Sequence, residues 1–530
     1  KKFIVKSYGK KGEDVVNKNY AAVDRGGEYK TLTVDPAWAN LPDDAKVENN
    51  DPAFINEVVR PINAQDGDLL PVSAFKGIED GTWYQGTSKY EKRGVAAFVP
   101  EWNAENCIQC GICSFVCPHA TIRPFLLTEE EVANAPMEFE TLQAMGKGVE
   151  NLKYRIQVTP ANCVGCGLCA VECPGKAGNK ALEMVDINEK LGEEPLADYL
   201  FKQVEYKTEY FPKDTVKGSQ FLMPYFEVSG SCPGCGETPY YKLVSQLFGR
   251  DMLVANATGC SMIYCSSTPS TPFVNDANGE GVAWANSLFE DNAEFGYGMA
   301  LAQNYKEARI LKTMEDNMEN VEPALKDAFA KYIEVHGDRE AEREVAPTIK
   351  ELAAKSDIAD VKELAEEDLI SKSVWIVGGD GWAYDIGYGG LDHVLANDLN
   401  VNVLVLDTEV YSNTGGQSSK SSQAASIAKF AAGGKTTAKK DLGQIAMAYG
   451  HVYVASISMG ANKAQTLKAI KEAESYNGPS LILAYSPCAE HGIKGGLANH
   501  QKTQAKAVEC GYLDLYRYDP RKETPLTIDS

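Results

Sequence analysis

From residue 252 onwards, four short apolar runs each end in a polar or glycine-rich loop. Continuous apolar runs of this length are typical of strands that are buried on both faces, as in a parallel sheet. Ligands of such sheets bind beyond the carboxyl ends of the strands. We therefore expect an α/β domain with a mostly parallel sheet, whose loops converge at one edge. The runs are 252–256, 374–377, 401–406 and 480–485.

Other stretches have helical or irregular patterns. Residues 301–371 are rich in Ala, Glu, Lys and Leu at helical spacing, which predicts a solvated helical excursion. The small-residue segment 418–432 and the segment 129–145 are each expected to form a helix, the second one on the surface. Several Asp, Asn and Pro residues between 47 and 86 suggest an extended connector or an ordered linker packed on a neighbour. Beyond Val508 the chain is polar and has no obvious closing element.

Composition restricts the class of protein and its partners. The chain has 530 residues, of which 44% are hydrophobic and 24% charged, as is ordinary for a soluble protein of several domains. Its net charge of −22 argues against nucleic acid or an anionic membrane as a main partner. No apolar run approaches about 20 residues and no signal peptide is visible, so we expect a cytoplasmic protein. The chain begins with Lys, which suggests that it is not a complete translation product.

Eight of the 14 cysteines form an internal repeat. The pattern Cys-x-x-Cys-x-x-Cys-x-x-x-Cys-Pro begins at Cys107 and recurs at Cys163. It is typical of bacterial two-cluster ferredoxins, in which the fourth cysteine of each run ligates the other [4Fe–4S] cluster. Zinc is the alternative, but this spacing matches two tetrahedral Cys pairs poorly. We expect an α+β ferredoxin-like module with one cluster on Cys107, Cys110, Cys113 and Cys173, and the other on Cys117, Cys163, Cys166 and Cys169.

Four further cysteines are predicted to lie near the edge of the parallel sheet. Cys232 and Cys235 form a Cys-x-x-Cys pair, while Cys260 and Cys488 follow two of the predicted strands. If these strands are parallel neighbours, their carboxyl ends bring the four thiols together. A third [4Fe–4S] cluster, a zinc ion or simply buried thiols would each fit this spacing. The two electron-carrier clusters upstream favour a third cluster, because a cofactor that yields electrons needs a conductor beside it.

The two central loops carry groups suited to a pyrophosphate and a divalent cation. The segment 378–382, Gly-Gly-Asp-Gly-Trp, follows one strand, and the loop 407–416 follows the next. Flanking glycines let backbone amides approach a phosphate, and Mg²⁺ prefers oxygen ligands. Asp380, the Thr408 hydroxyl and a carbonyl near Val410 could supply half of such a cage. The loop pair resembles the pyrophosphate–Mg²⁺ signature of thiamine diphosphate enzymes, with Thr408 in place of the usual asparagine.

The combination of these motifs resembles the pyruvate:ferredoxin (flavodoxin) oxidoreductase family over nearly the whole chain. The most specific segments are 231–237, 284–291, 378–385 and 407–417. The resemblance implies that Asp380, Thr408 and the Val410 carbonyl bind Mg²⁺, and that Asn413 faces the substrate. The residues that it implies around thiamine diphosphate are Glu237, Cys260, Gly379, Asp380, Gly381, Trp382, Thr408, Glu409, Val410, Tyr411, Ser412 and Asn413. Thr408 is what that family carries, whereas Cys265 stands where the family usually has a small residue.

The same resemblance implies a domain order and a function. We expect the end of a coenzyme A-binding type domain at 1–47, a linker at 48–90, the two-cluster module at 91–205 and the thiamine diphosphate domain at 206–530. The implied activity is oxidative decarboxylation of pyruvate to acetyl-CoA and CO₂, with electrons passing through three clusters to ferredoxin or flavodoxin. Another 2-oxoacid:ferredoxin oxidoreductase and a non-catalytic iron–sulfur electron-transfer module are the alternatives. The sites for pyruvate and coenzyme A would lie mainly on domains outside this chain, and the family suggests a homodimer.

Overall fold

The chain separates into two compact units, Lys1–Pro52 and Ala53–Ser530. The computed structural model describes residues 1–40, 51–267, 269–287 and 291–530. In the first unit, helices α1 (Lys2–Tyr8) and α2 (Glu13–Arg25) bury no side chain. The candidate site residues predicted from the sequence all lie in the second unit.

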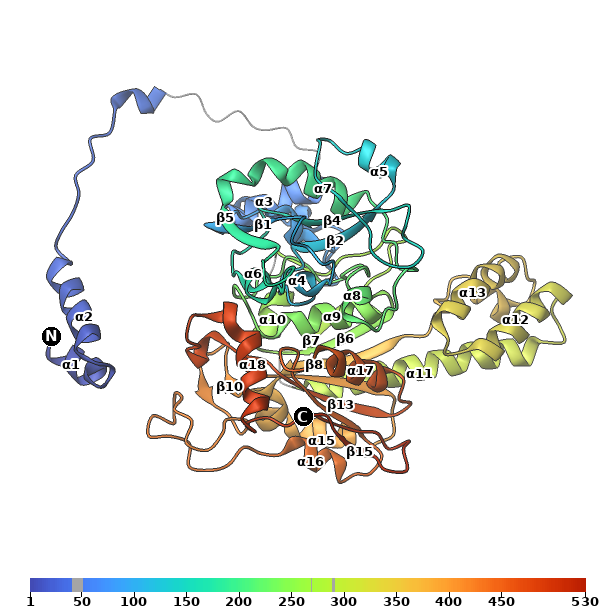
Figure 1. Cartoon of the computed structure of the whole chain (residues 1–530). Coiled ribbons are helices and arrows are strands. Elements are labelled where there is room, and N and C mark those ends of the chain that lie inside the picture. The colour runs from blue at the N-terminus through green and yellow to red at the C-terminus, as the bar shows by residue number, and fades with distance from the viewer. Residues whose placement is uncertain (41–50, 268, 288–290) are drawn as a thin grey trace. The chain divides into compact units, whose positions relative to one another are not determined.

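An eight-stranded sheet forms the centre of the second unit (Figure 1). The strand order is β15-β14-β12-β13-β9-β8-β6-β7; the last six are parallel, and β14 and β15 add an antiparallel edge. The four apolar runs are therefore strands, as predicted, and the mostly parallel α/β fold is confirmed. The bounds are β6 (Met252–Ala257), β7 (Ala283–Ser287), β8 (Ser373–Gly379), β9 (Val401–Asp407), β12 (Tyr453–Ile457), β13 (Pro479–Tyr485), β14 (Tyr516–Tyr518) and β15 (Leu526–Ile528).

Helices cover both faces of this sheet, which explains why its strands are continuously apolar. Along β8, Trp375 and Val377 enter one apolar core, while Val374 and Ile376 enter the other. Helices α9 and α17 contribute to the first core, and α15 and α16 to the second. The bounds are α8 (Val216–Ser219), α9 (Thr238–Phe248), α10 (Cys260–Cys265), α15 (Tyr388–Leu395), α16 (Leu442–Met447), α17 (Lys463–Glu474) and α18 (His500–Glu509).

The cysteine repeat lies in a separate α+β module, as expected. Strands β1 and β5 pair antiparallel, and β2, β4 and β3 form a second antiparallel sheet. The short helices α4 and α6 occupy equivalent places in the two halves of the repeat, and each contains the third cysteine of its run. The bounds are β1 (Phe98–Trp102), β2 (Ile122–Leu127), β3 (Leu142–Gln143), β4 (Lys153–Val158), β5 (Leu182–Asp186), α4 (Ile112–Phe115), α5 (Glu129–Ala133), α6 (Leu168–Glu172) and α7 (Glu194–Lys202).

A helical lobe extends from the sheet between β7 and β8 (Figure 1, yellow). It has an apolar core of its own, with Met314, Phe329 and Ile349 fully buried. The helices predicted in 301–371 are therefore present, and they form a packed subdomain. Its helices are α11 (Asn292–Asn317), α12 (Pro323–Val335), α13 (Arg339–Ala353) and α14 (Ala359–Glu363).

Three predictions of secondary structure were wrong. The segment 418–432 is not a helix, because three of its serines donate side-chain hydrogen bonds to Asp380, Asp407 and the Glu409 carbonyl instead of continuing a helical repeat. The segment 129–145 is helical only in α5, which the Thr128–Glu131 capping box starts, and ends in the short strand β3. Beyond Val508, β14 and β15 close the sheet by antiparallel main-chain pairing, and each has only three residues, too few to show a strand pattern in the sequence.

The segment after residue 50 is packed rather than extended. A π-helical turn at Ile55–Val59 leads into α3 (Arg60–Asn63), and Ile55, Val58 and Val59 are buried. Buried apolar side chains hold a short helical segment that would be marginal in isolation. The first part of the predicted linker lies outside the described residues.

Candidate functional site

The loops that follow β6, β8, β9 and β13 meet at the carboxyl edge of the sheet, because these four strands are neighbours. Asp380 directly follows β8 and Thr408 directly follows β9. The Thr408 hydroxyl lies 3.0 Å from Asp380 Oδ1 and 3.0 Å from the Val410 carbonyl oxygen. These three oxygens therefore converge, and such a hard oxygen donor set is the kind that Mg²⁺ prefers.

The Asp380 carboxyl is fully enclosed. Burial raises its pKa well above the usual value, and the neighbouring Asp407 raises it further. Ser419 donates a hydrogen bond of 2.5 Å to Asp380 Oδ2, which leaves Oδ1 facing Thr408. A buried carboxyl with an adjacent hydroxyl and carbonyl fits a divalent cation, because a cation favours the ionised acid.

A buried ion-pair network holds the loop that carries Thr408 in place. Lys439 Nζ lies 2.7 Å from Asp407 and 2.9 Å from Glu409, the two residues that flank Thr408. Tyr512 donates a 2.5 Å hydrogen bond to the other Glu409 oxygen. Glu409 also has a left-handed backbone, with φ of 60°, which the network holds in place. The Glu409 side chain, expected to line the cofactor, therefore points into this network.

The remaining residues predicted around the cofactor differ in where they lie. At Gly381, an added Cβ would lie 2.4 Å from the Tyr411 ring, whose hydroxyl donates to the Gly381 carbonyl at 3.2 Å. Trp382 is buried in the second apolar core. Ser412 lies 2.7 Å from the Thr408 hydroxyl. The exposed Asn413 and the adjoining Gly379 complete the two loops.

Several residues that support this edge were not predicted from the sequence, and Ser419 and Lys439 are two of them. Ser419 contacts Asp380 from 39 positions away, and Lys439 contacts Asp407 from 32 positions away. Both come from a segment of small and polar residues without a recognisable motif. Only the path of the folded chain reveals them.

Each half of the cysteine repeat contributes to both of two small cavities. We call Cys107, Cys110, Cys113 and Cys173 the first thiol set, and they line one cavity. We call Cys117, Cys163, Cys166 and Cys169 the second thiol set, and they line the other cavity. The fourth cysteine of each run has thus crossed to the other half, which is the arrangement expected for two clusters.

The surroundings of these thiols suit bound clusters. Gly165 N–H donates to Cys163 Sγ at 3.4 Å, and Ala181 N–H donates to Cys173 Sγ at 3.3 Å. Burial raises the pKa of Cys163 to about 12 and that of Cys166 to about 11, so these thiols are neutral without a metal. Among the described residues, no three His, Cys, Asp or Glu side chains converge on one ion. The thiols surround a cavity instead.

The four cysteines of the third thiol set, Cys232, Cys235, Cys260 and Cys488, also come together. Burial raises the pKa of Cys260, and the neighbouring Glu237, Cys235, Cys488 and Cys232 raise it further. Burial also raises the pKa of the Glu237 carboxyl to about 7, and its Oε2 has no hydrogen-bond partner in the structure. Cys232, Cys235, Cys488 and Glu237 thus lie within electrostatic reach of Cys260, and their role as one ligand set stays a prediction.

Short contacts link the third thiol set to the Asp380 edge on one side and to the second thiol set on the other. His491 accepts a hydrogen bond from Cys488 N–H at 3.2 Å and lies 2.6 Å from the Thr408 carbonyl, linking the third thiol set to the Asp380 edge. On the other side, His119 lines the cavity of the second thiol set and lies 3.0 Å from Ser231 Oγ, next to Cys232. The third set therefore lies between the oxygen-rich edge and the second set.

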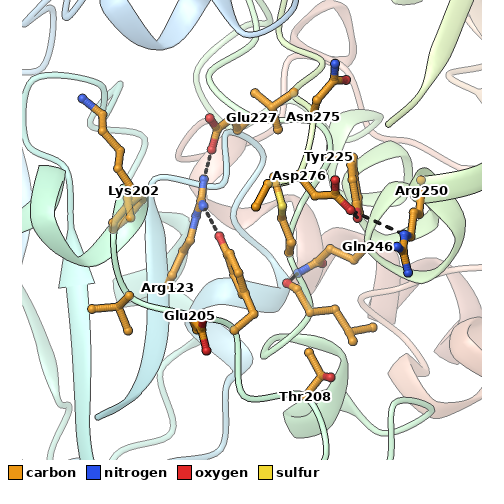
Figure 2. Close-up of a pocket in the computed structure, with 18 of the residues that line it drawn as sticks. Arg123, Lys202, Glu205, Thr208, Tyr225, Glu227, Gln246, Arg250, Asn275 and Asp276 are labelled. Atoms are coloured by element: carbon orange, nitrogen blue, oxygen red, sulfur yellow. Dashed lines mark hydrogen bonds and ion pairs between the residues drawn. The ribbon is translucent and has the colours of Figure 1, made fainter. Parts of the chain in front are cut away.

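A further cavity of about 840 Å³ lies between the two-cluster module and the α/β domain. Figure 2 shows Arg123 directed at Glu227, with which it forms an ion pair, and Asp276 beside Arg250 at 3.4 Å. Arg123 also donates to Tyr206 at 2.8 Å. In this cavity, Arg123 thus pairs with Glu227, and Arg250 pairs with Asp276.

Comparison with known proteins agrees with the division into a two-cluster module and an α/β domain. Residues 103–177 match the family model "4Fe-4S dicluster domain", and residues 352–484 match "Thiamine pyrophosphate enzyme, C-terminal TPP binding domain". Residues 42–96 match a domain of unknown function. Fold and matches together define an iron–sulfur protein that carries a thiamine pyrophosphate enzyme domain.

The relatives identify the class more closely. The chain is 52% identical to pyruvate:ferredoxin oxidoreductase of Moorella thermoacetica, over 98% of this chain and 45% of that protein. It is 48% identical to pyruvate-flavodoxin oxidoreductase of Klebsiella pneumoniae, over 100% of this chain and 46% of the relative. Along its length, the chain is thus homologous to the pyruvate:ferredoxin (flavodoxin) oxidoreductases, and it spans about half the length of these two relatives.

A third relative and a solved structure complete the comparison. Pyruvate dehydrogenase [NADP(+)] of Euglena gracilis is 45% identical over 99% of this chain and 30% of its own length. A solved 2-oxoglutarate:ferredoxin oxidoreductase from Magnetococcus marinus matches with a TM-score of 0.29 at 18% identity, over 49% of this chain and 64% of that one. No helix of the described residues has both the length and the apolar character needed to cross a membrane.

Proposed function

We propose that this chain is the electron-transfer and thiamine pyrophosphate-binding part of an enzyme that oxidatively decarboxylates pyruvate to acetyl-CoA and CO₂. The observation that carries this proposal is the juxtaposition of the third thiol set with the Asp380 edge, linked through His491. A two-cluster module alone needs no such edge, and a thiamine enzyme without electron transfer needs no such thiols. The relatives' names agree with this assignment.

When bound, thiamine diphosphate would supply the electron sink for decarboxylation, and the clusters would carry single electrons. Asp380, Thr408 and the Val410 carbonyl would hold Mg²⁺, and the loop 408–413 would hold the pyrophosphate. Lys439 keeps this loop in place by pairing with the acids on either side of Thr408. Asn413, exposed on the same loop, would face the substrate.

The contacts between the thiol sets order the proposed path of electrons. The third thiol set adjoins the Asp380 edge, where thiamine diphosphate would bind, and the second set adjoins the third through His119 and Ser231. Helices α4 and α6 pack against each other and bring the first set beside the second. The first set is thus farthest from the thiamine edge along the path, where electrons would leave for ferredoxin or flavodoxin.

The first test is iron and acid-labile sulfide per chain after anaerobic reconstitution, with EPR after dithionite reduction. About twelve irons support three [4Fe–4S] clusters, whereas about eight would remove the third. Cys260→Ala should lower the count by about four. A normal iron content in this variant would contradict the assignment of Cys260 as a ligand.

A second test addresses thiamine. Isothermal titration of thiamine diphosphate with Mg²⁺ should show binding in the wild type and a loss of affinity in Asp380→Ala. No binding to the wild type would favour the non-catalytic electron-transfer module. Substrate assays, on a protein that also carries the pyruvate and coenzyme A sites, separate pyruvate from another 2-oxoacid. Sedimentation in solution tests the homodimer, and fractionation of cells tests the cytoplasmic location.

A further inference from the structure

A lysine from the thiamine-type domain is buried against the two-cluster module. Lys242 lies in the middle of α9 and is only 1% exposed. Its ammonium group donates to the backbone carbonyls of Ser114 and Phe115, the latter at 3.1 Å, and lies 3.5 Å from Gln220 Oε1. Among the residues that the structure describes, no carboxylate pairs with it.

The cysteine repeat supplies an internal comparison for this contact. Ser114 and Phe115 are the first and second residues after Cys113, and Ala170 and Val171 are the first and second after Cys169. Lys180 donates to the Ala170 carbonyl at 2.6 Å and to the Val171 carbonyl at 2.7 Å. Each half of the module thus has a lysine on the same two carbonyls. Lys180 is exposed, whereas Lys242 is buried.

A buried cation without a carboxylate partner is costly unless other negative charge compensates it. Burial lowers the pKa of Lys242 to about 8, so the ammonium form still predominates at neutral pH. Negative charge on Cys117 and Cys113, as in ligated thiolates, would favour this ammonium, while the nearby Arg123 acts against it. These cysteines belong to the second and first thiol sets, so ligated clusters would be the compensating charge.

We propose that Lys242 is an electrostatic tuning residue of the two-cluster module, whose buried positive charge raises the reduction potential of both clusters. This inference rests on the proposed function, because it requires clusters on the first and second thiol sets. A cluster held by either thiol set would gain one electron, passed along the path from the third thiol set, and with it one negative charge, without any bond being broken. A fixed positive charge in a water-poor environment stabilises this reduced state.

The test is an EPR-monitored redox titration of the anaerobically reconstituted chain. In general, a unit charge at roughly 8 Å and an effective dielectric constant of about 20 changes such an equilibrium on the order of thirtyfold. Lys242→Gln, which keeps a donor but removes the charge, should lower the equilibrium constant for cluster reduction at least about tenfold, equivalent to about 59 mV for one electron. Lys242→Arg should keep it within about threefold. Lys180→Gln, the matched control, should also change it less than about threefold, because solvent screens its charge.

A second variant leaves the lysine in place. Gln220→Glu puts a carboxylate beside the ammonium group, because Gln220 Oε1 lies 3.5 Å from Lys242 Nζ. It should also lower the equilibrium constant for cluster reduction about tenfold, since it compensates the same positive charge. It decides the question alone if Lys242→Gln fails to retain iron. Unchanged potentials in cluster-loaded Gln220→Glu, or equal shifts in Lys242→Gln and Lys180→Gln, would overturn the inference. A wild-type chain that takes up no iron would overturn the proposed function, and this inference with it.

Discussion

Burial of the ion-pair network around the Thr408 loop sets how much stability the loss of Lys439 should cost. Lys439 compensates two acids, Asp407 and Glu409, whose side chains are only 5% and 8% exposed. Lys439→Met keeps the apolar stem but leaves both carboxylates without a counter-charge. Removing one partner of a buried pair costs about 3–5 kcal/mol, which lowers the apparent melting temperature of a domain of this size by about 4–7 °C. Lys439 itself is partly accessible, so we expect the lower half of this range.

Scanning calorimetry of the wild type and two variants measures this effect. The matched control is Lys312→Met, because Lys312 pairs with Asp316 at 2.8 Å but both side chains are highly exposed, at 73% and 60%. Such surface pairs contribute about 0–1 kcal/mol, so the control should melt within about 1.5 °C of the wild type. Lys439→Met should also weaken binding of Mg²⁺ with thiamine diphosphate by about 10–100-fold, because it frees the loop that holds them.

The pH dependence of Lys439→Met checks the cause. Without Lys439, two buried carboxylates have no counter-charge, and burial of an uncompensated carboxylate favours its protonated form. The folded variant then binds more protons than the unfolded one, so its stability falls as the pH rises. The gap to the wild type should be wider at pH 8 than at pH 5. Equal melting of Lys439→Met and Lys312→Met, or a gap independent of pH, would refute this account of the network.

Three further predictions address other parts of the chain. Cys173→Ser should lower the iron content by about four atoms per chain. Adding Cys107→Ser, from the same thiol set, should cost no further iron, whereas adding Cys163→Ser should cost about four more. The reverse pattern would exclude the crossover of the fourth cysteines. Gly175→Ala should lower the iron content of the first set, because its Cβ would lie 1.8 Å from the Asn179 carbonyl oxygen, while Gly178→Ala, also at positive φ but with nothing within 4 Å, should retain iron; equal contents would contradict the clash. In the helical lobe, burial alone would raise the pKa of Glu342, but the ion pair with His336 at 3.0 Å and hydrogen bonds from Ser371 and Gly337 N–H hold it at about 2. The stability that this depressed pKa contributes is present above about pH 4.5 and is lost towards pH 2. The protection factors of amides in 292–363, which are corrected for the intrinsic exchange rate at each pH, should therefore fall over this range in the wild type and stay constant in Glu342→Gln.

Local sequence was sufficient for elements whose pattern is set by their immediate neighbours. The strands of the sheet are continuously apolar because both faces are covered, and the order of the parallel strands then brings Asp380 and Thr408 to one edge. The cysteine repeat predicted the two-cluster module because four thiolates per cluster demand that spacing. The helical lobe followed from its periodicity, since an amphipathic helix shows its buried face in the sequence.

Contacts between distant segments were decided by the tertiary structure alone. The segment 418–432 has a composition suited to a helix, but its serines serve Asp380 and Asp407, which lie on other loops. Lys439 lies beneath Thr408, and Lys242 reaches the two-cluster module, without any local pattern that marks them. The physical reason is the same in each case: a hydrogen bond or ion pair depends on where the packed strands and helices place two groups, and neither group carries a local signal of its partner. The sequence by itself thus determined which strands form and which cysteines can ligate clusters, while the fold decided which charges surround them.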